Sequence, residues 1–388
     1  MLKLFLLSCT RFFRFWRLCW TGTATLPRRG VKRIGLVLAW PLFIMLQLLH
    51  WLGFALDEVL FRSYRNVKVR PPLFVVGPPR SGTTHLHHVL SQDPETTTLA
   101  TWECLFALSV TARKLVLVCC AMDRAIGRPL ARLIAWLEQR MLGSMDDVHP
   151  FSLTAPEEDF LVFMPLGQCF ILVVLFPTAE SLWRIARLDT DCSDDEQALW
   201  VDWYRRCVRK HLYVHGDDRT FLSKNASFSG SVQCLLRAFP EASLLVCSRD
   251  PINTVPSQLS TILPGFCAAG FDSLDPQFQK RLIELLKHYY LHLAAIEQQC
   301  GASMAFLDNA DLRHRLHASL AEAMSKLKRT LSSDFVERLQ QADQLSRGSS
   351  SSHRYSLADF GLTEQAIHDQ FAEVYARYQF DQPGVVLR

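Results

Sequence analysis

The sequence predicts an α/β protein whose parallel β-sheet is covered by helices on both faces, with a largely helical insertion and an N-terminal hydrophobic helix. Three observations lead to this prediction. Short apolar runs alternate with helical patterns through most of the chain. A glycine-containing loop directly follows the first of these runs. A long uncharged segment lies ahead of it.

The basic excess of the chain is concentrated at its N-terminus. The 388 residues are 49% hydrophobic and 21% charged, which is typical of a globular protein, and the net charge is +4. Residues 1–33 contain no acid and eight basic residues: Lys3, Arg11, Arg14, Arg17, Arg28, Arg29, Lys32 and Arg33. Without those eight, 34 basic residues face 38 acidic ones. The body therefore has no basic stripe of the kind that binds nucleic acid, and no nucleic-acid partner is expected.

Residues 34–61 are a candidate membrane anchor. Residues 34–56 carry no charged side chain, and a helix needs about 20 apolar residues to cross a bilayer core. Pro41 and His50 are unfavourable inside lipid, so a spanning helix, an in-plane or re-entrant helix and a buried helix all stay open. The preceding "FFRFWRLCW" interleaves arginines with aromatic residues, as interfacial helices do.

Three segments are therefore expected. They are a basic aromatic segment at 1–33, the anchor candidate at 34–61 and the α/β domain at 62–388. The positive charges ahead of the anchor predict a membrane protein with a cytoplasmic N-terminus. The membrane would be the inner membrane if the protein is bacterial, and of the Golgi type if it is eukaryotic.

The elements of the body follow in chain order. Strands are expected at 73–76, 220–222, 244–247 and 304–307, and helices at 83–90, 229–239, 251–262, 277–299 and 363–378. The stretch 102–212 is mostly helical and is expected to shape the acceptor pocket, with the uncharged run 160–177 buried inside it. The cysteines show no zinc-binding spacing, and those in apolar runs, such as Cys119 and Cys120, are expected to be core residues.

The sequence "GPPRSGTT", residues 77–84, follows the first strand and leads into a helix. Gly77 and Gly82 have the spacing of a phosphate-binding P-loop, but Thr83 stands where a nucleotide-hydrolysing enzyme has lysine. Successive backbone N–H groups at a helix N-terminus bind an anion, and Ser81, Thr83 and Thr84 add hydroxyl donors. The cation is Arg80, inside the loop. The missing lysine disfavours a kinase-like, nucleotide-using enzyme, which is kept as an alternative.

A second motif, "SRDPINTVPS" at 248–257, follows the strand at 244–247. Together with "PRSGTT" at 79–84, it resembles the sulfotransferases that use 3′-phosphoadenosine 5′-phosphosulfate (PAPS), in particular the membrane-linked bacterial and tyrosylprotein or Golgi-type enzymes. The resemblance runs from about residue 56 to 378. It implies that the loop at 77–84 binds the 5′-phosphosulfate, and that Arg249 and Ser257 bind the 3′-phosphate. An arginine fork with a hydroxyl at a helix start suits that phosphate.

The resemblance also implies the reaction. PAPS is the expected co-substrate, and its sulfuryl group would pass to a hydroxyl of an unidentified acceptor: a glycan, a lipid, a tyrosine or a small alcohol. Lys224, in "FLSKNASFSG", occupies the family's lysine, and Arg80 and Lys224 would stabilise the transferred group. No metal is expected, because PAPS lacks the polyphosphate that recruits Mg²⁺. A non-catalytic PAPS-binding membrane protein is the other alternative.

The general base is expected to be Glu103, which follows Arg80 near where tyrosylprotein sulfotransferases place a glutamate. His149 and the pair Glu158 and Asp159 are rival candidates. Cytosolic sulfotransferases place an arginine of a flexible loop against the 3′-phosphate. Two arginines near the serine run are candidates for that contact here: Arg347 and Arg354.

Overall fold

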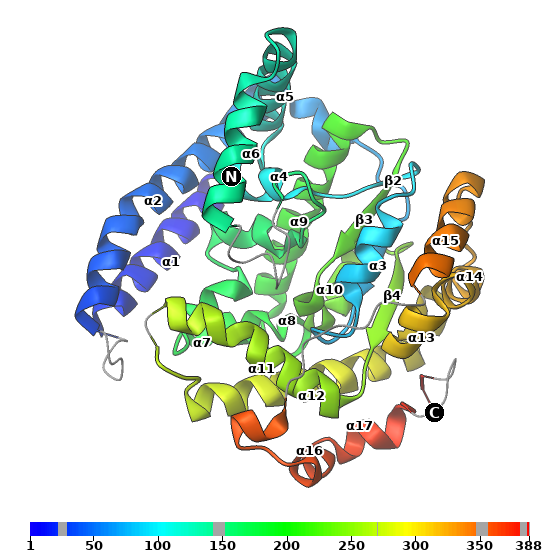
Figure 1. The fold of residues 1–388 in the computed structure, drawn as a ribbon. Helices are drawn as coiled ribbons and strands as arrows, with labels where there is room; N and C mark the ends of the chain where they lie inside the picture. Colours follow the sequence, from blue (N-terminus) through cyan, green and yellow to red (C-terminus); the bar gives the residue numbers. More distant parts are fainter. Residues whose placement is uncertain (22–28, 143–151, 270, 347–355, 381–385, 388) are drawn as a thin grey trace.

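A five-stranded parallel sheet forms the centre of the protein (Figure 1). The computed structural model describes residues 1–388 except 22–28, 143–151, 270, 347–355, 381–385 and 388. The strand order is β2-β3-β1-β4-β5, with β1 in the middle. The strands are β1 (Leu73–Val76), β2 (Thr96–Thr97), β3 (Thr220–Lys224), β4 (Ser243–Ser248) and β5 (Met304–Asp308). The predicted α/β architecture is confirmed. Only β2 was missed, because two residues at a sheet edge are too short for a periodic signal.

Helices cover both faces of this sheet. Successive strand residues point to opposite faces, so Leu73 and Val75 pack on one side while Phe74 and Val76 pack on the other. The first side is covered by α3 (Thr83–Leu90), α14 (Leu316–Lys326) and α15 (Ser333–Ser346). The second side is covered by α9 (Asp194–His215), α10 (Val232–Ala238) and α12 (Pro276–Cys300).

The predicted helical insertion is present between β2 and β3. Its helices before α9 are α4 (Thr101–Phe106), α5 (Val110–Ala125), α6 (Pro129–Leu142), η2 (Asp159–Leu166), η3 (Phe170–Val174), α7 (Glu180–Ile185) and α8 (Leu188–Asp191). The uncharged run 160–177 forms η2 and η3, and Val162, Phe163 and Leu166 have almost no exposed surface, as predicted. The expectation that Cys119 and Cys120 are core residues is wrong. Both are exposed, because their apolar run lies on a side of α5 that no other part of the described chain covers.

The remaining helices refine the predicted ones. The helix expected at 229–239 begins later, because η4 (Ala226–Gly230) precedes α10. The helix expected at 363–378 is two helices, α16 (Glu364–Gln370) and α17 (Ala372–Arg377), separated at Phe371. Further, α11 (Pro251–Ala268) follows β4 and α13 (Asn309–His314) follows β5.

The two N-terminal helices pack against this body (Figure 1, dark blue). The predicted boundary between residues 33 and 34 falls inside α2 (Arg29–Leu60), which lies beside α1 (Leu2–Thr21). Within α2, Val37–Leu60 is long and apolar enough to cross a membrane, by length and composition alone. Near its end, the buried Asp57 carboxylate forms an ion pair with Lys210 of α9. The same carboxylate accepts hydrogen bonds from the first backbone N–H groups of α5.

Candidate active site

The loop between β1 and α3 has the backbone of an anion cradle. Gly77 and Gly82 have φ values of +141° and +97°. A Cβ at Gly77 would lie 2.1 Å from the carbonyl oxygen of Cys247, so only glycine fits there. Arg80 also has a positive φ, +69°, which is uncommon for a residue with a side chain and is frequent at ligand-binding sites. Ser81 and Thr83 are buried and Thr84 is half-buried at the start of α3.

The two predicted phosphate motifs meet in one place. β1 and β4 are adjacent and parallel, so the segments that follow them leave the same edge of the sheet. Arg80 Nε donates a hydrogen bond of 3.1 Å to Ser257 Oγ on α11. Arg249 Nη1 donates one of 3.2 Å to the carbonyl oxygen of Arg80. Residues separated by about 170 positions in the chain therefore form a single polar site.

A third cation, Arg313, belongs to this site and was missed by sequence reasoning. It lies on α13, directly after β5 at the same sheet edge. Burial, then the charges of Arg313 and Arg80, lower the pKa of Arg249. Within the described parts of the chain, none of these three arginines forms an ion pair with an acid. Such uncompensated positive charge favours an anionic ligand. The available signal was an arginine shortly after a predicted strand.

Two hydroxyl groups support the same conclusion. Ser81 Oγ in the loop and Ser248 Oγ at the end of β4 are buried and have no hydrogen-bond partner. A buried hydroxyl without a partner is unfavourable, so such groups commonly mark the place of a ligand or a water. Each of these serines is next to a site arginine in the chain, Arg80 or Arg249, and the combined donor set fits a nucleotide that carries two phosphate groups.

Lys224 lies on the other side of β1, where β3 ends. It is paired in register with Val75, two residues before the loop begins. Its side chain is almost fully buried, and Nζ forms an ion pair with Glu158, whose side chain is 28% exposed. The neighbouring Asp159 instead faces the core, where the Tyr204 hydroxyl donates a hydrogen bond to it. Burial raises the pKa of Asp159 to about 7. Of these two acids, only Glu158 contacts the lysine.

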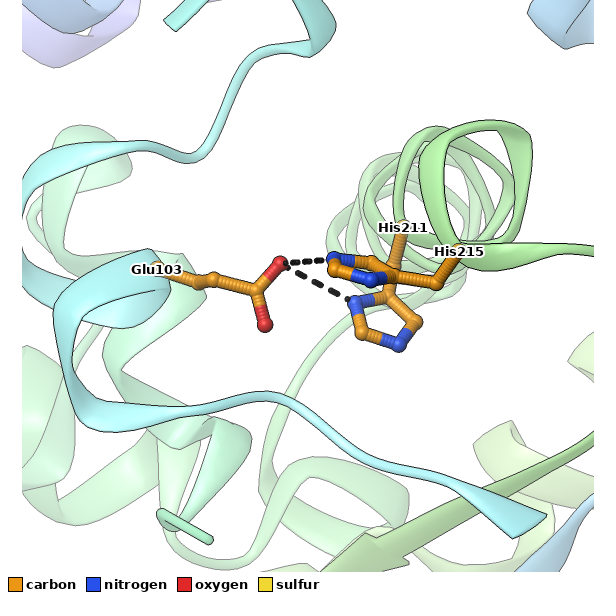
Figure 2. Close-up of side chains that lie close together, drawn as sticks. All are labelled: Glu103, His211 and His215. Carbon is orange, nitrogen blue, oxygen red and sulfur yellow. Dashed lines mark hydrogen bonds and ion pairs between the residues drawn. The ribbon is translucent and has the colours of Figure 1, made fainter. Parts of the chain in front are cut away.

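Glu103 lies in a closed network (Figure 2). Its Oε1 atom is 2.7 Å from Arg113 Nε, 2.9 Å from His215 Nε2 and 3.2 Å from His211 Nδ1. Its Oε2 atom accepts a hydrogen bond from the N–H of Ala100. Burial opposes ionisation, but His211, Arg113 and His215 together hold the pKa of Glu103 well below its usual value. Glu103 is only 1% exposed.

Glu103, His211 and His215 are also the residue types that bind transition metals. Their ligand atoms lie within 4.8 Å of one another. However, the oxygen that would bind a cation already faces the guanidinium of Arg113, which is fully buried. A divalent ion there would repel a charge that no solvent screens. The carboxylate is satisfied by its hydrogen-bond donors, and the group fits a metal poorly.

Three predicted site residues, His149, Arg347 and Arg354, lie outside the described residues. Their roles stay predictions.

Comparison with known proteins places the geometry in a family. The model of the sulfotransferase family matches residues 71–310, which include the loop, Glu103, Lys224, Arg249 and Ser257. The chain belongs to the sulfotransferase family.

Relatives and solved structures agree with this assignment. The omega-hydroxy-beta-dihydromenaquinone-9 sulfotransferases Stf3 of Mycobacterium bovis and Mycobacterium tuberculosis are each 26% identical over 235 residues. The match covers 58% of this chain and 55% of theirs, so it spans about half the length of these relatives.

Two sulfotransferase crystal structures share the fold. STF1 from M. tuberculosis H37Rv has a TM-score of 0.67 at 20% identity, covering 92% of this chain and 89% of that one. STF9 from Mycobacterium avium has a TM-score of 0.67 at 17% identity, covering 87% and 83%. The resemblance and the fold class expected from the sequence are both confirmed.

Proposed function

We propose that this sulfotransferase moves the sulfuryl group of PAPS to a hydroxyl of an acceptor molecule. The observation that supports this most is the junction of the two phosphate motifs, where Arg80 bonds Ser257 and Arg249 bonds the loop backbone. One bisphosphate nucleotide can reach both motifs only if they open on the same side of the molecule, and these do.

Different residues of the site bind the two phosphate groups of PAPS. The N–H groups of residues 80–84, with the Arg80 side chain and the hydroxyls of Ser81, Thr83 and Thr84, hold the 5′-phosphosulfate at the N-terminus of α3. Arg249 and Ser257 hold the 3′-phosphate, and Arg313 adds positive charge there. Arg347 and Arg354 are further candidates for this phosphate.

The transfer needs charge stabilisation and proton removal. Lys224 and Arg80 stabilise the charge that develops on the oxygen between sulfur and phosphorus. Glu158 accepts the proton of the acceptor hydroxyl while that oxygen bonds to sulfur. The bond from sulfur to the phosphate oxygen breaks, and adenosine 3′,5′-bisphosphate leaves. The ion pair between Lys224 and Glu158 opens to release both groups for these tasks.

Glu158 is preferred to Glu103 as the base because of access. A base must come within about 3 Å of the hydroxyl it deprotonates. The side chain of Glu158 is partly exposed beside Lys224, whereas both oxygens of Glu103 are occupied and buried. We assign Glu103 a positioning role, in which it holds α4 and α9 beside the acceptor site.

The acceptor is proposed to be the hydroxyl of a lipid. The relatives act, by their names, on a hydroxylated menaquinone. The apolar stretch of α2 supports membrane association, and we propose that the N-terminal segment binds lipid with the N-terminus on the cytoplasmic side.

Transfer of labelled sulfate from PAPS to a lipid extract tests the reaction. We expect labelled lipid with PAPS and much less with adenosine 5′-phosphosulfate, which lacks the 3′-phosphate. Transfer of phosphate from ATP and Mg²⁺ would support the kinase-like alternative. PAPS binding without transfer to any lipid, glycan, phenol or alcohol would support the non-catalytic one.

Two glutamine variants separate the candidate bases. Glu158→Gln is expected to lower the turnover number about 10²–10⁴-fold, with unchanged affinity for adenosine 3′,5′-bisphosphate and unchanged thermal stability. Glu103→Gln is expected to lower thermal stability first. A stable Glu103→Gln protein that binds the nucleotide but does not turn over would return the base to Glu103.

A further inference from the structure

Most exposed apolar side chains that the structure describes are gathered on four helices. Among the described residues, all large hydrophobic side chains that are exposed, except Phe106 and Ile171, lie on α1, α2, α5, α6 or the α5–α6 turn. We call these residues the apolar face. They are Leu2, Leu6, Phe13, Trp20, Ile34, Leu38, Leu42, Met45, Leu48, Leu49, Leu52, Leu56, Val59, Leu60, Leu115, Leu117, Val118, Met122, Ile126, Leu130, Leu133, Ile134, Trp136 and Leu137. Soluble proteins rarely expose so many together.

The four helices form one continuous surface. α2 packs against α1 and against α5, and α6 packs against α5, so the helices follow one another along one side of the molecule (Figure 1). On α6, Leu130, Leu133, Ile134 and Leu137 have the spacing of one helical stripe. All four are exposed, so this stripe has no covering element among the described residues.

The charges around the apolar face are almost all positive. Residues 1–56 contain no acid, and the first one, Asp57, is buried in its ion pair with Lys210. On α5, α6 and their turn, the exposed charged side chains that the structure describes are all basic: Lys114, Arg124, Arg128, Arg132 and Arg140. Asp123 is buried and accepts hydrogen bonds from the first N–H groups of α6. Basic residues around an apolar surface complement anionic lipid headgroups.

Helices α1 and α2 lie along the body and do not project from it (Figure 1). Trp51 and Phe54 of α2 are core residues, and α1 buries Phe12, Phe15 and Cys19 against the body. A helix that spans a bilayer next to a soluble domain must leave that domain and meet lipid on all its sides. Here α1 and α2 each have one side on protein and one side exposed.

We propose that the apolar face docks in the plane of a bilayer that contains anionic lipid, with α1, α2, α5 and α6 immersed at its surface. A groove of about 300 Å³ between α1 and α2, lined by aromatic residues such as Phe5, Phe13, Trp16 and Trp40, opens on this face. This is about twice the volume of a cavity that holds benzene, so it accommodates part of a lipid chain.

The face is also connected to the proposed catalytic acid. Arg11 of α1 donates a hydrogen bond of 3.0 Å to the carbonyl oxygen of Leu166, the last residue of η2. Glu158 directly precedes the first residue of that helix. One short helix therefore separates the groove from the acid. Delivery of a lipid hydroxyl along this route rests on the proposed function, whereas docking itself does not.

Vesicle flotation of the full chain, without PAPS, tests docking separately from catalysis. We expect binding to phosphatidylcholine vesicles that contain phosphatidylglycerol, and weaker binding without it. Leu133→Glu with Leu137→Glu is expected to weaken binding at least about tenfold, because each leucine loses about 1.5–3 kcal/mol of burial. The matched control is Ala321→Glu, on the exposed side of α14 across the molecule, which should bind as the native chain does.

A charge pair provides a second test that leaves the apolar residues intact. Arg132→Glu is expected to weaken binding to anionic vesicles about fivefold or more, since each basic residue near such a surface contributes about 1 kcal/mol. Arg338→Glu on α15 makes the same charge change at an exposed site outside the face and should have no effect beyond that of net charge. Equal binding by all these variants, each with native thermal stability, would overturn the proposal.

Protease accessibility distinguishes in-plane docking from spanning. In proteoliposomes carrying the full chain with an N-terminal tag, in-plane docking predicts that added protease cuts the tag in every molecule whose catalytic body it cuts. A tag protected while the body is cut would show that the chain spans the bilayer, and the in-plane arrangement would be wrong.

Discussion

The carboxyl edge of the sheet and the apolar face differ in chemistry but share one property. At the sheet edge, Arg80, Arg249 and Arg313 converge without an acid to neutralise them among the described residues. On the apolar face, leucine side chains of four helices are exposed. Among the described residues, the arginines form no ion pair with an acid and the apolar side chains have no apolar surface over them. The sheet edge therefore indicates an anion and the helical side indicates lipid.

The ion pair that joins α2 to the body, between Asp57 and Lys210, should show the largest effect. If α2 is part of the body, Asp57→Asn should destabilise the protein by about 3–5 kcal/mol, because Lys210 is left buried without its partner. Chemical denaturation followed by circular dichroism measures this. If α2 were only an attached anchor, the free energy of unfolding would not change.

A double variant controls for that result. Asp57→Leu combined with Lys210→Met removes both charges, and replacing a buried pair by apolar groups is often neutral. We expect the double variant to recover much of the stability. The recovery is incomplete because the first N–H groups of α5 lose the carboxylate that accepts their hydrogen bonds. A double variant as unstable as Asp57→Asn would assign the effect to those N–H groups alone.

Lys224→Met should separate the two regions functionally. We expect the turnover number to fall about 10²–10³-fold, the usual cost of one preorganised donor. Vesicle flotation should be unchanged, since Lys224 is buried at the end of β3 and is not one of the residues of the apolar face. Sulfate transfer and flotation on the same preparation measure both. A parallel loss of lipid binding would mean that the two regions are not independent.

Sequence reasoning succeeded at the sheet edge because the determinants there are local. Gly77, Arg80 and Arg249 each follow an apolar run, and parallel strands bring their carboxyl ends to one edge whatever lies between them. Chain spacing alone could not rank Glu103 against Glu158, because the choice depends on which way each side chain points. Glu103 turns toward α9, where His211 and His215 lie, while Glu158 turns toward Lys224.

The apolar face could be predicted only in part, for a related reason. The run at 34–56 is recognisably hydrophobic, but hydrophobicity alone does not tell whether protein or lipid covers such a run. The same ambiguity led Cys119 and Cys120 of α5 to be assigned to the core. Burial is a property of the assembled fold. Only the structure shows that no described element covers the apolar stripe of α6, so the sequence alone could not identify it as a surface.

His211, which contacts Glu103, predicts a loss of stability in acid. Burial lowers the pKa of His211 to about 4 from its usual 6.5. His211 therefore binds a proton below about pH 6.5 in the unfolded chain, but only below about pH 4 in the folded protein. The contribution of neutral His211 to the free energy of unfolding is fully present above pH 6.5 and is lost as the pH falls. The loss is about 2 kcal/mol at pH 5 and about 3 kcal/mol in total.

The His211→Gln variant tests this assignment. Glutamine does not titrate, so its free energy of unfolding should change less between pH 7 and pH 5 than that of the native protein. His50 and His288, whose pKa values burial also lowers to about 4, give the same background slope in both proteins. Equal pH dependence in the two proteins would mean that His211 is not the group that titrates.

The smallest expected effect concerns recognition of the 3′-phosphate. Arg249→Ala should weaken binding of adenosine 3′,5′-bisphosphate about tenfold or more, the loss of a hydrogen bond to a charged group, and leave adenosine 5′-phosphate binding nearly unchanged. Calorimetry with both nucleotides measures the difference. Arg249 also donates to the carbonyl oxygen of Arg80, so its removal could distort the loop itself. In that case both nucleotides would bind more weakly and by the same factor. Only a selective loss for the bisphosphate assigns Arg249 to the second phosphate, because a distorted loop acts on the 5′-phosphate that both ligands share.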